Sequence, residues 1–416
     1  MAGVMGAAAR KAEEADALLG VRPEAVYEPS TVEEAIEAVR ESARDRKRLA
    51  FVGGGTDLSL GAPPSALDAV LKTGRLTRVI EHAPSDQIVI AEAGLTLKAL
   101  QDALASHRQR LALDPPLPAR ATLGGIVAAN AFGPRRARYG SVRDLIIGVS
   151  IVRSDGTAAR GGGKVVKNVA GFDLPKLMVG SLGTLGLIAT VTFRLYPLPE
   201  HTVTLVLPGC SSRELRKLVG RLREAQLEPA SVVAFWKEGE SFDFAVRFEG
   251  FRKGVAEQCE RFGSLVQGET GAACGSLDAA AAEALWSKHD ALRSEPSFRA
   301  KLAALPSSIE SLTAEALPPL SSALASPGFL WYATLGLGFV TGEPRSAEAL
   351  AAAVESARAR LSRAGGALTL QAAPPAVRER VDPWGPPPAA LPLMKSVKQR
   401  LDPEERLSPG RFVGGI

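Results

Sequence analysis

Three glycine-rich segments in the first half of the chain have the residue types best suited to binding a ligand. They read Gly53-Gly54-Gly55-Thr56-Asp57, Ala121-Thr122-Leu123-Gly124-Gly125-Ile126 and Gly180-Ser181-Leu182-Gly183-Thr184-Leu185-Gly186. Glycine lets the backbone approach a phosphate closely, and bare N–H groups that converge on an anion bind it. One such loop is weak evidence, because three consecutive glycines more often form an ordinary turn. Three of them indicate one long, phosphate-bearing ligand that lies across a domain.

The spacing of these glycines excludes two common nucleotide-binding motifs. A Rossmann fingerprint, G-x-G-x-x-G, opens a helix after a strand, whereas the glycine that follows Gly53–Gly55 is Gly61, out of register. A P-loop requires G-x-x-x-x-G-K-[ST]. Here Gly163-Lys164 is followed by Val165, and Ala158 stands where the first glycine belongs.

The composition is that of an ordinary globular protein. The chain has 416 residues, of which 46% are apolar and 23% charged, and this length corresponds to roughly two to three domains. The net charge of +5 comes from scattered basic residues, so a nucleic-acid partner is not expected. The 3 cysteines form no C-x-x-C pair and the 4 histidines lie far apart, which argues against a disulfide framework, a metal site and an iron–sulfur cluster.

The sequence contains no predicted secretion signal and no predicted transmembrane segment. Residues 1–20 carry several charges and no continuous apolar core, and no apolar run elsewhere approaches membrane-spanning length. We therefore expect a cytoplasmic protein, and leave open that it lies peripherally at the inner membrane through a complex.

The predicted elements place the first two glycine segments where a strand ends or a helix begins, and the third before a strand. A helix is expected at 30–44, with Ser30 or Thr31 as N-cap and Glu33 or Glu34 as capping-box partner. Thr96 and Thr122 are expected to cap two further helices. Alternating apolar residues predict strands at 49–52, 78–82, 87–93, 145–153 and 187–196.

A domain boundary is expected at Pro197-Leu198-Pro199, beyond which the pattern changes. Helices are predicted at 214–225, 253–262 and 347–364, and strands at 231–236, 243–248, 329–340 and 367–371. This alternation indicates an α+β domain with two similar halves, although no repeated sequence is evident. Residues 372–392 are rich in proline and alanine and are expected to form a linker or wrapping loop.

Six segments follow a pattern that is shared with a known family, namely Gly53–Thr56, Ala121–Gly125, Gly133–Asp144, Gly162–Asp173, Gly180–Ile188 and Leu401–Arg411. Together they resemble the FAD-binding domain of the vanillyl-alcohol oxidase/p-cresol methylhydroxylase (PCMH) family. The resemblance is dense over residues 22–200, thin in the second domain, and returns at Leu401–Arg411, where Ser408 replaces the family's usual asparagine. The segments 162–173 and 180–188 are similar in particular to the FAD-binding subunits of glycolate oxidases.

The resemblance implies an α+β fold, in which a two-subdomain PCMH-type FAD-binding domain is followed by a ferredoxin-like α+β cap domain. The expected organisation is an N-terminal helical extension at 1–21, the FAD-binding domain at 22–199, the cap or interface domain at 200–371, and a segment at 372–416 that returns to the FAD-binding domain. The implied FAD-binding residues are Gly53, Gly54, Gly55, Thr56, Asp57, Thr122, Gly124, Gly125, Arg138, Gly140, Asp173, Gly183, Gly186 and Ile188.

Two departures from the family refine this expectation. Many members attach FAD covalently through a histidine in the first loop or a cysteine near the flavin. Here that loop offers Thr56 and Asp57, and all three cysteines fall in the second domain, so non-covalent FAD is expected. Hydroxyacid-oxidising relatives carry a histidine-rich segment that supplies metal ligands and a base, whereas His201 and His289 are isolated. No catalytic residue can therefore be named.

Three functions remain open at this point. The first is an FAD-binding subunit of a multi-subunit glycolate (2-hydroxyacid) dehydrogenase, whose partners are a catalytic flavoprotein sister subunit and an iron–sulfur subunit, with a small hydroxyacid as substrate of the complex. The second is a self-sufficient FAD-dependent oxidoreductase on another small alcohol or hydroxyacid, with Tyr139 or Asp144 as base. The third is a non-catalytic, flavin-containing assembly subunit.

Overall fold

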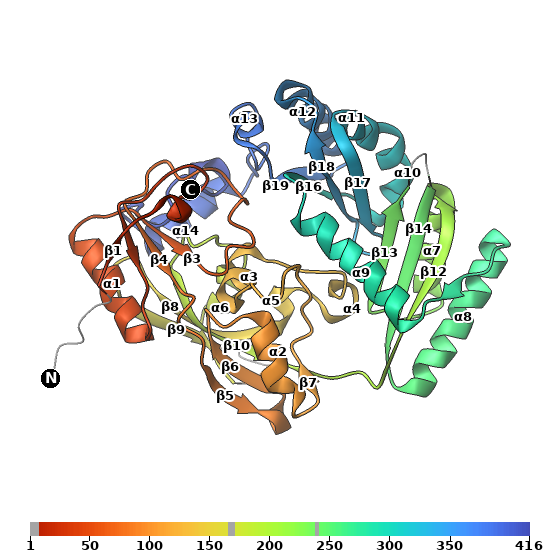
Figure 1. Ribbon diagram of the computed structural model, residues 1–416, viewed down its shortest axis with the longest axis horizontal. Helices are drawn as coiled ribbons and strands as arrows, with labels where there is room; N and C mark the ends of the chain where they lie inside the picture. Colours follow the sequence, from red (N-terminus) through yellow and green to blue (C-terminus); the bar gives the residue numbers. More distant parts are fainter. Residues whose placement is uncertain (1–7, 165–170, 238–240) are drawn as a thin grey trace. The chain divides into compact units, whose positions relative to one another are not determined.

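The computed structural model describes residues 8–164, 171–237 and 241–416, which divide into two compact units. The first unit comprises Met1–Phe132, Gly140–Leu198 and Pro386–Ile416, and the second comprises Gly133–Tyr139 and Pro199–Gly385. The chain therefore leaves the first unit and returns to it twice (Figure 1). The expected linker at 372–392 is split, because residues up to Gly385 belong to the second unit.

Two main sheets build the first unit. The smaller has the order β1-β2-β4-β3, with β4 parallel to both β2 and β3. The larger is antiparallel with the order β5-β6-β10-β8-β9. The strands of the unit are β1 (Arg10–Lys11), β2 (Ala25–Tyr27), β3 (Leu49–Val52), β4 (Ala69–Lys72), β5 (Val79–Ala83), β6 (Ile88–Glu92), β7 (Gln109–Arg110), β8 (Ile146–Val152), β9 (Ala158–Gly162), β10 (Leu187–Arg194) and β11 (Tyr196–Pro197).

Short capped helices connect these strands. Thr31 caps α1 by accepting a hydrogen bond from the N–H of Glu34, whose carboxylate accepts from the N–H of Ser30. Thr96 and Thr122 cap α2 and α3 in the same way. The helices are α1 (Val32–Arg44), α2 (Leu97–Ala105), α3 (Leu123–Ala129), α5 (Val142–Leu145), α6 (Leu174–Met178) and α14 (Leu391–Leu401).

The second unit is built on one antiparallel sheet with the order β15-β12-β14-β13-β17-β18-β16-β19. Its strands are β12 (His201–Ser211), β13 (Ser231–Trp236), β14 (Ser241–Gly250), β15 (Gly275–Ser276), β16 (Phe298–Ala303), β17 (Leu324–Tyr332), β18 (Leu337–Pro344) and β19 (Ala367–Ala372). Its helices are α4 (Arg136–Tyr139), α7 (Ser212–Glu224), α8 (Arg252–Thr270), α9 (Ala279–Ser294), α10 (Ile309–Ser311), α11 (Leu317–Ser322), α12 (Ala347–Arg363) and α13 (Pro375–Arg378).

This sheet contains the same topology twice. In chain order the first half runs β12-α7-β13-β14-α8-β15, and the second runs β16, α10 and α11, β17-β18-α12-β19. Each half is thus a β-α-β-β-α-β unit of ferredoxin-like order, and the halves join edge to edge through β13 and β17. Apolar side chains from alternate strand positions form one core with α7, α8 and α12, while α9 packs on the opposite face (Figure 1).

Two sequence expectations differ from the structure. The single strand expected at 329–340 is the hairpin of β17 and β18, which turns between Tyr332 and Leu337. Within 1–21, residues 1–7 lie outside the described part, and the rest holds β1 and one 3-10 turn at Glu14–Asp16 instead of a helical extension. The helix α9 is absent from the sequence prediction. None of the described helices is long and apolar enough to cross a membrane.

Candidate functional site

A hollow of about 780 Å³, including the part open to solvent, lies within the first unit. Segments far apart in the sequence line it, namely the loop after β3, the start of α3 and the turn before β10. Eleven of the fourteen predicted site residues lie on its wall: Gly53, Gly54, Gly55, Thr56, Asp57, Thr122, Gly124, Gly125, Gly183, Gly186 and Ile188.

The first loop packs so tightly that two of its glycines leave no room for a side chain. A Cβ at Gly54 would lie 1.6 Å from the carbonyl oxygen of Arg120, and one at Gly53 would lie 2.2 Å from Oγ1 of Thr122. Gly55 has φ +75°, a backbone conformation that favours glycine. The backbone N–H groups of residues 53–56 donate no hydrogen bond to any described residue. These donors border the hollow and are therefore available to an anion.

The start of α3 forms the second part of the wall. Oγ1 of Thr122 accepts a hydrogen bond of 3.3 Å from the N–H of Gly125. The N–H of Gly124 donates to the carbonyl oxygen of Ala93 over 2.7 Å, and a Cβ at Gly124 would lie 2.8 Å from the Cβ of Ala93. The glycines thus let α3 sit directly against the end of β6.

The third segment is a turn that enters β10. Gly183 and Gly186 have φ +74° and +153°, and a Cβ at Gly183 would lie 3.3 Å from the ring of Phe51. The N–H of Leu182 donates to the carbonyl oxygen of Ala128, which ties this turn to α3. The apolar wall of the hollow is completed by Ala128, Ala129, Leu182, Leu187 and Ile188.

The other three predicted residues have different surroundings and do not line the hollow. Arg138 belongs to the second unit, where it donates to the carbonyl oxygen of Glu249 and pairs with Glu228 over 3.7 Å. Gly140, with φ +83°, packs against Asp144. Asp173 is exposed and caps α6, and its hydrogen bond with Lys176 lowers the pKa of its carboxyl.

Part of the family-like segment at 162–173 cannot be placed. Residues 165–170 lie outside the described part of the chain. On its flanks, Lys164 pairs with Glu81 over 2.6 Å at an exposed site, and Phe172 is exposed.

The hollow also contains two residues that the sequence analysis did not assign, Ser408 and Arg411. Both are buried and come from the C-terminal segment, more than 200 residues beyond the last glycine segment. Their only sequence signal is the Leu-Ser-Pro-Gly-Arg text at 407–411. Oδ1 of Asn130, at the end of α3, and Oγ of Ser181, in the third glycine segment, are among the buried polar atoms without a hydrogen-bond partner in the described part of the chain, but neither residue lines the hollow.

Two of the histidines, His289 and His82, have hydrogen-bond partners away from the hollow. His289 is buried in the second unit, where Nε2 lies 2.6 Å from the hydroxyl of Tyr332 and Nδ1 lies 2.8 Å from Asp290. Burial lowers the pKa of this imidazole, and its hydrogen bond with Asp290 opposes that shift. His82 lies 2.9 Å from Oε1 of Gln109 in the first unit. Among the described residues no group of three or more His, Cys, Asp and Glu side chains could hold a metal ion.

The donors and walls of this hollow fit FAD. Free backbone N–H groups suit a pyrophosphate, the glycines let it approach, and the apolar wall suits an aromatic ring system. The hollow is formed by residues of the first unit alone.

Comparison with known proteins gives the same assignment. Residues 23–162 match the family described as "FAD binding domain". The chain is 38% identical over 186 residues to a D-lactate dehydrogenase of Archaeoglobus fulgidus, covering 44% of this chain and 41% of that protein. It is 34% identical over 200 residues to the glycolate oxidase subunit GlcE of Escherichia coli, covering 47% and 55%. The matches thus span about half the length of these relatives or less.

Among solved structures, an alkyldihydroxyacetonephosphate synthase superposes with a TM-score of 0.72. The superposition covers 95% of this chain and 78% of the other at 15% identity, so it concerns the fold alone. Residues 23–162 therefore belong to an FAD-binding domain of the PCMH type, with FAD as its cofactor.

Proposed function

We propose that this chain is the FAD-binding subunit of a multi-subunit glycolate (2-hydroxyacid) dehydrogenase or oxidase, and that it holds non-covalent FAD for electron transfer. The observation that carries the proposal is the glycine-lined hollow with its free N–H donors. The names of the relatives support the substrate class, because they include a D-lactate dehydrogenase, glycolate oxidase subunits and a D-2-hydroxyglutarate dehydrogenase.

In this function the residues of the chain bind and orient the cofactor. The N–H groups of residues 53–56 would hold the pyrophosphate, and Thr56 would add a hydroxyl donor. Leu182, Leu187 and Ile188 would exclude water from the neighbouring wall. When bound, FAD supplies the redox chemistry, since it can accept a pair of electrons and pass them on singly.

Non-covalent binding is supported by the positions and acidity of the cysteines. Neither cysteine nor histidine is found among the described residues that line the hollow. All three cysteines belong to the second unit, where burial raises the pKa of Cys210 to about 12 and that of Cys259 to about 11. A thiol that stays protonated at neutral pH is a poor nucleophile.

The need for a catalytic partner is supported by the state of the candidate bases. His289 is enclosed by Tyr332 and Asp290. The hydroxyl of Tyr139 lies 3.3 Å from the carboxylate of Glu249, and Asp144 accepts hydrogen bonds from the N–H and hydroxyl of Ser141. We therefore propose that a catalytic flavoprotein sister subunit abstracts the proton and that an iron–sulfur subunit accepts the electrons. Any association with the inner membrane would occur through this complex.

The test is the visible absorption spectrum of the chain expressed alone, recorded before and after anaerobic addition of glycolate. We expect an oxidised flavin spectrum that glycolate leaves unchanged, and reduction once the catalytic partner is added. Bleaching of the isolated chain by glycolate would contradict the need for a partner and favour a self-sufficient oxidoreductase. D-lactate, the substrate named for one relative, is then the second compound to test. Release of the flavin by acid precipitation of the protein checks that it is not covalently bound.

A further inference from the structure

The C-terminal segment at 398–411 is held in the first unit by three buried basic side chains, and one of these, Arg411, reaches the cofactor hollow.

Residues 406–408 extend the smaller sheet at the edge of β3. The N–H of Leu49 donates to the carbonyl oxygen of Arg406 over 2.8 Å, and the N–H of Ser408 donates to the carbonyl oxygen of Leu49 over 2.9 Å. Leu407 is buried against the core of this sheet. The strand that ends in the glycine loop is thus paired along its second edge by the C-terminal segment.

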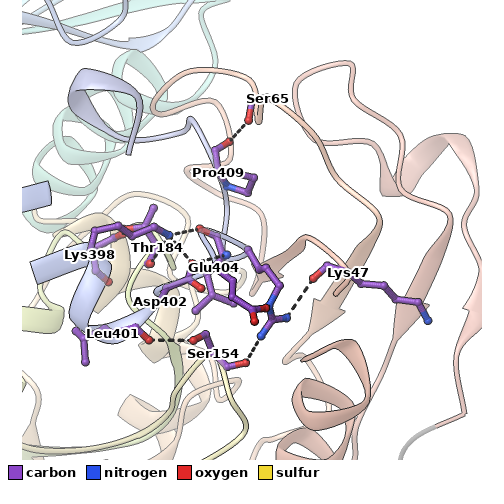
Figure 2. Close-up of polar contacts among 12 residues, drawn as sticks. Lys47, Ser65, Ser154, Thr184, Lys398, Leu401, Asp402, Glu404 and Pro409 are labelled. Atoms are coloured by element: carbon purple, nitrogen blue, oxygen red, sulfur yellow. Dashed lines mark hydrogen bonds and ion pairs between the residues drawn. The ribbon is translucent and has the colours of Figure 1, made fainter. Parts of the chain in front are cut away.

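Two of the basic side chains, Lys398 and Arg406, donate to residues that do not line the hollow. Nζ of Lys398 donates to Asp402 over 2.7 Å and to the carbonyl oxygens of Thr184 and Leu407 over 2.9 Å each (Figure 2). Nη1 of Arg406 donates to the carbonyl oxygens of Ser42 and Lys47 over 3.2 Å each. Neither residue lines the hollow.

Arg411 differs from both. Its Nη2 donates to the carbonyl oxygens of Leu58 and Leu60, over 3.1 and 2.7 Å, in the turn that follows the glycine loop. The backbone carbonyl of Arg411 accepts a hydrogen bond from the N–H of Ala62 over 3.1 Å. Two residues earlier, the carbonyl oxygen of Pro409 accepts a hydrogen bond from the hydroxyl of Ser65 (Figure 2). The side chain is 4% exposed and still lines the hollow together with Ser408.

The charges on the wall point to the same residue. Among the described residues that line the hollow, Arg411 is the one basic side chain and Asp57 the one acidic side chain. The pyrophosphate of FAD is a dianion, and the free N–H groups of the glycine loop supply dipoles but no full charge. A guanidinium held in low dielectric beside that loop attracts an anion far more strongly than one in water does.

We propose that Arg411 is an FAD-binding residue that provides the counter-charge for the pyrophosphate, so that the C-terminal segment forms a fourth part of the cofactor site. This inference rests on FAD being the ligand of the hollow. It assigns to Arg411 an electrostatic role in addition to its two hydrogen bonds to the backbone.

The test compares FAD binding by the full chain and by R411Q, from the quenching of flavin fluorescence at low and high NaCl. Loss of a charge-assisted contact should weaken binding on the order of 10- to 100-fold. The salt dependence should also be smaller in R411Q, because salt screens the attraction that the variant lacks. ADP, which carries the same pyrophosphate, should lose affinity in parallel when titrated calorimetrically.

R406Q is the matched control, because Arg406 is equally buried in the same segment but does not line the hollow. It should lower the melting temperature of the apoprotein and leave the salt dependence of FAD binding as in the unchanged chain. R411K retains the positive charge and is the variant to measure if R411Q does not fold. We expect it to keep most of the salt dependence.

Equal FAD affinity and equal salt dependence in R411Q and the unchanged chain would overturn the role of Arg411. So would an R411K variant that loses the salt dependence although its charge is kept. Failure of the unchanged chain to bind FAD at all is a different result, which would instead remove the ligand on which the inference rests.

Discussion

Gly54 is the residue of the cofactor hollow whose identity is most tightly fixed by its surroundings. Its missing Cβ would lie 1.6 Å from the carbonyl oxygen of Arg120, and a backbone atom cannot move aside as a flexible side chain can. The N–H groups of residues 53–56 all depend on the path of this loop. A change at Gly54 should therefore act on FAD binding through the direction of several donors at once.

Gly54→Ala is expected to displace the loop and weaken FAD binding at least about tenfold, since forcing atoms into a filled space costs about 1–3 kcal/mol. The measurement is fluorescence titration with FAD, alongside the melting temperature of the apoprotein. Gly74→Ala is the matched control, because a Cβ at Gly74 meets nothing within 4 Å. Undiminished FAD affinity in Gly54→Ala would show that the loop does not hold the cofactor.

Asp16 is a buried carboxylate whose ionisation contributes to stability. The hydrogen bond from Arg10 lowers its pKa most, and the N–H of Glu13 and the ammonium of Lys72 lower it further. A carboxyl whose pKa is depressed by folding stabilises the protein above its unfolded pKa of about 3.9, and this stability is lost as the pH falls through the folded value.

Asp16→Asn should therefore lower the free energy of unfolding at pH 7 by about 1–3 kcal/mol, because charged hydrogen bonds are lost. The difference between variant and unchanged chain should narrow as the pH falls below about 4. Urea unfolding at pH 7 and at pH 3.5 measures both. Asp102→Asn breaks an exposed pair with Lys98 and should change little at either pH. A difference in the free energy of unfolding between Asp16→Asn and the unchanged chain that does not depend on pH would contradict the role of the Asp16 charge.

At the scale of elements, a side chain of α14 connects the third glycine segment with the C-terminal segment. The buried ammonium of Lys398 donates to Asp402, the C-cap of its own helix, to Thr184 in the glycine turn and to Leu407 in the C-terminal segment. Burial lowers its pKa, while the carboxylate of Asp402 opposes that shift. One ammonium group thus donates hydrogen bonds to acceptors from three segments. Without it, each of these buried acceptors would lose that hydrogen bond.

Lys398→Met removes the ammonium and leaves the buried carboxylate of Asp402 without its ion-pair partner. We expect a loss of about 3–5 kcal/mol in the free energy of unfolding, the usual cost of breaking a buried pair from one side. Lys395→Met changes an exposed residue on the same helix and should stay within about 0.5 kcal/mol. Urea unfolding of both variants distinguishes the two sites. A similarly small effect at Lys398 would mean that water reaches Asp402 in solution.

The elements that could be predicted from the sequence are those whose ends contain a recognisable capping residue. Thr31, Thr96 and Thr122 cap the expected helices, because a side-chain acceptor three residues before an unpaired N–H is a local feature. The hairpin of β17 and β18 turns inside an apolar run without Asn, Asp or Pro, and Gly336, with φ +65°, is the turn signal that the prediction of one strand overlooked. Arg411 contacts Leu60 across 351 residues, a distance at which no spacing rule operates.

At the scale of the whole molecule, the two units can be observed separately in one chain. All 4 tryptophans, Trp236, Trp286, Trp331 and Trp384, lie in the second unit, whereas the hollow belongs to the first. Tryptophan emission therefore reports the second unit, and FAD binding reports the first. The first unit depends on three separate stretches of chain, the last of which is Pro386–Ile416.

A chain that ends at Gly385 should lose FAD binding, because it lacks Arg411, Ser408 and the segment at 406–408 that pairs with β3. It should keep the blue-shifted emission of a buried indole, since Trp331 is fully buried in a sheet that is complete without the removed residues. The two readouts are the tryptophan emission spectrum and the FAD titration of the shortened and full chains. The emission spectrum of each chain in urea serves as the unfolded reference. Retained FAD binding would show that the C-terminal segment is dispensable for the site. Red-shifted emission would show instead that the second unit needs the first in order to fold, and the chain would then have to be treated as one cooperative structure.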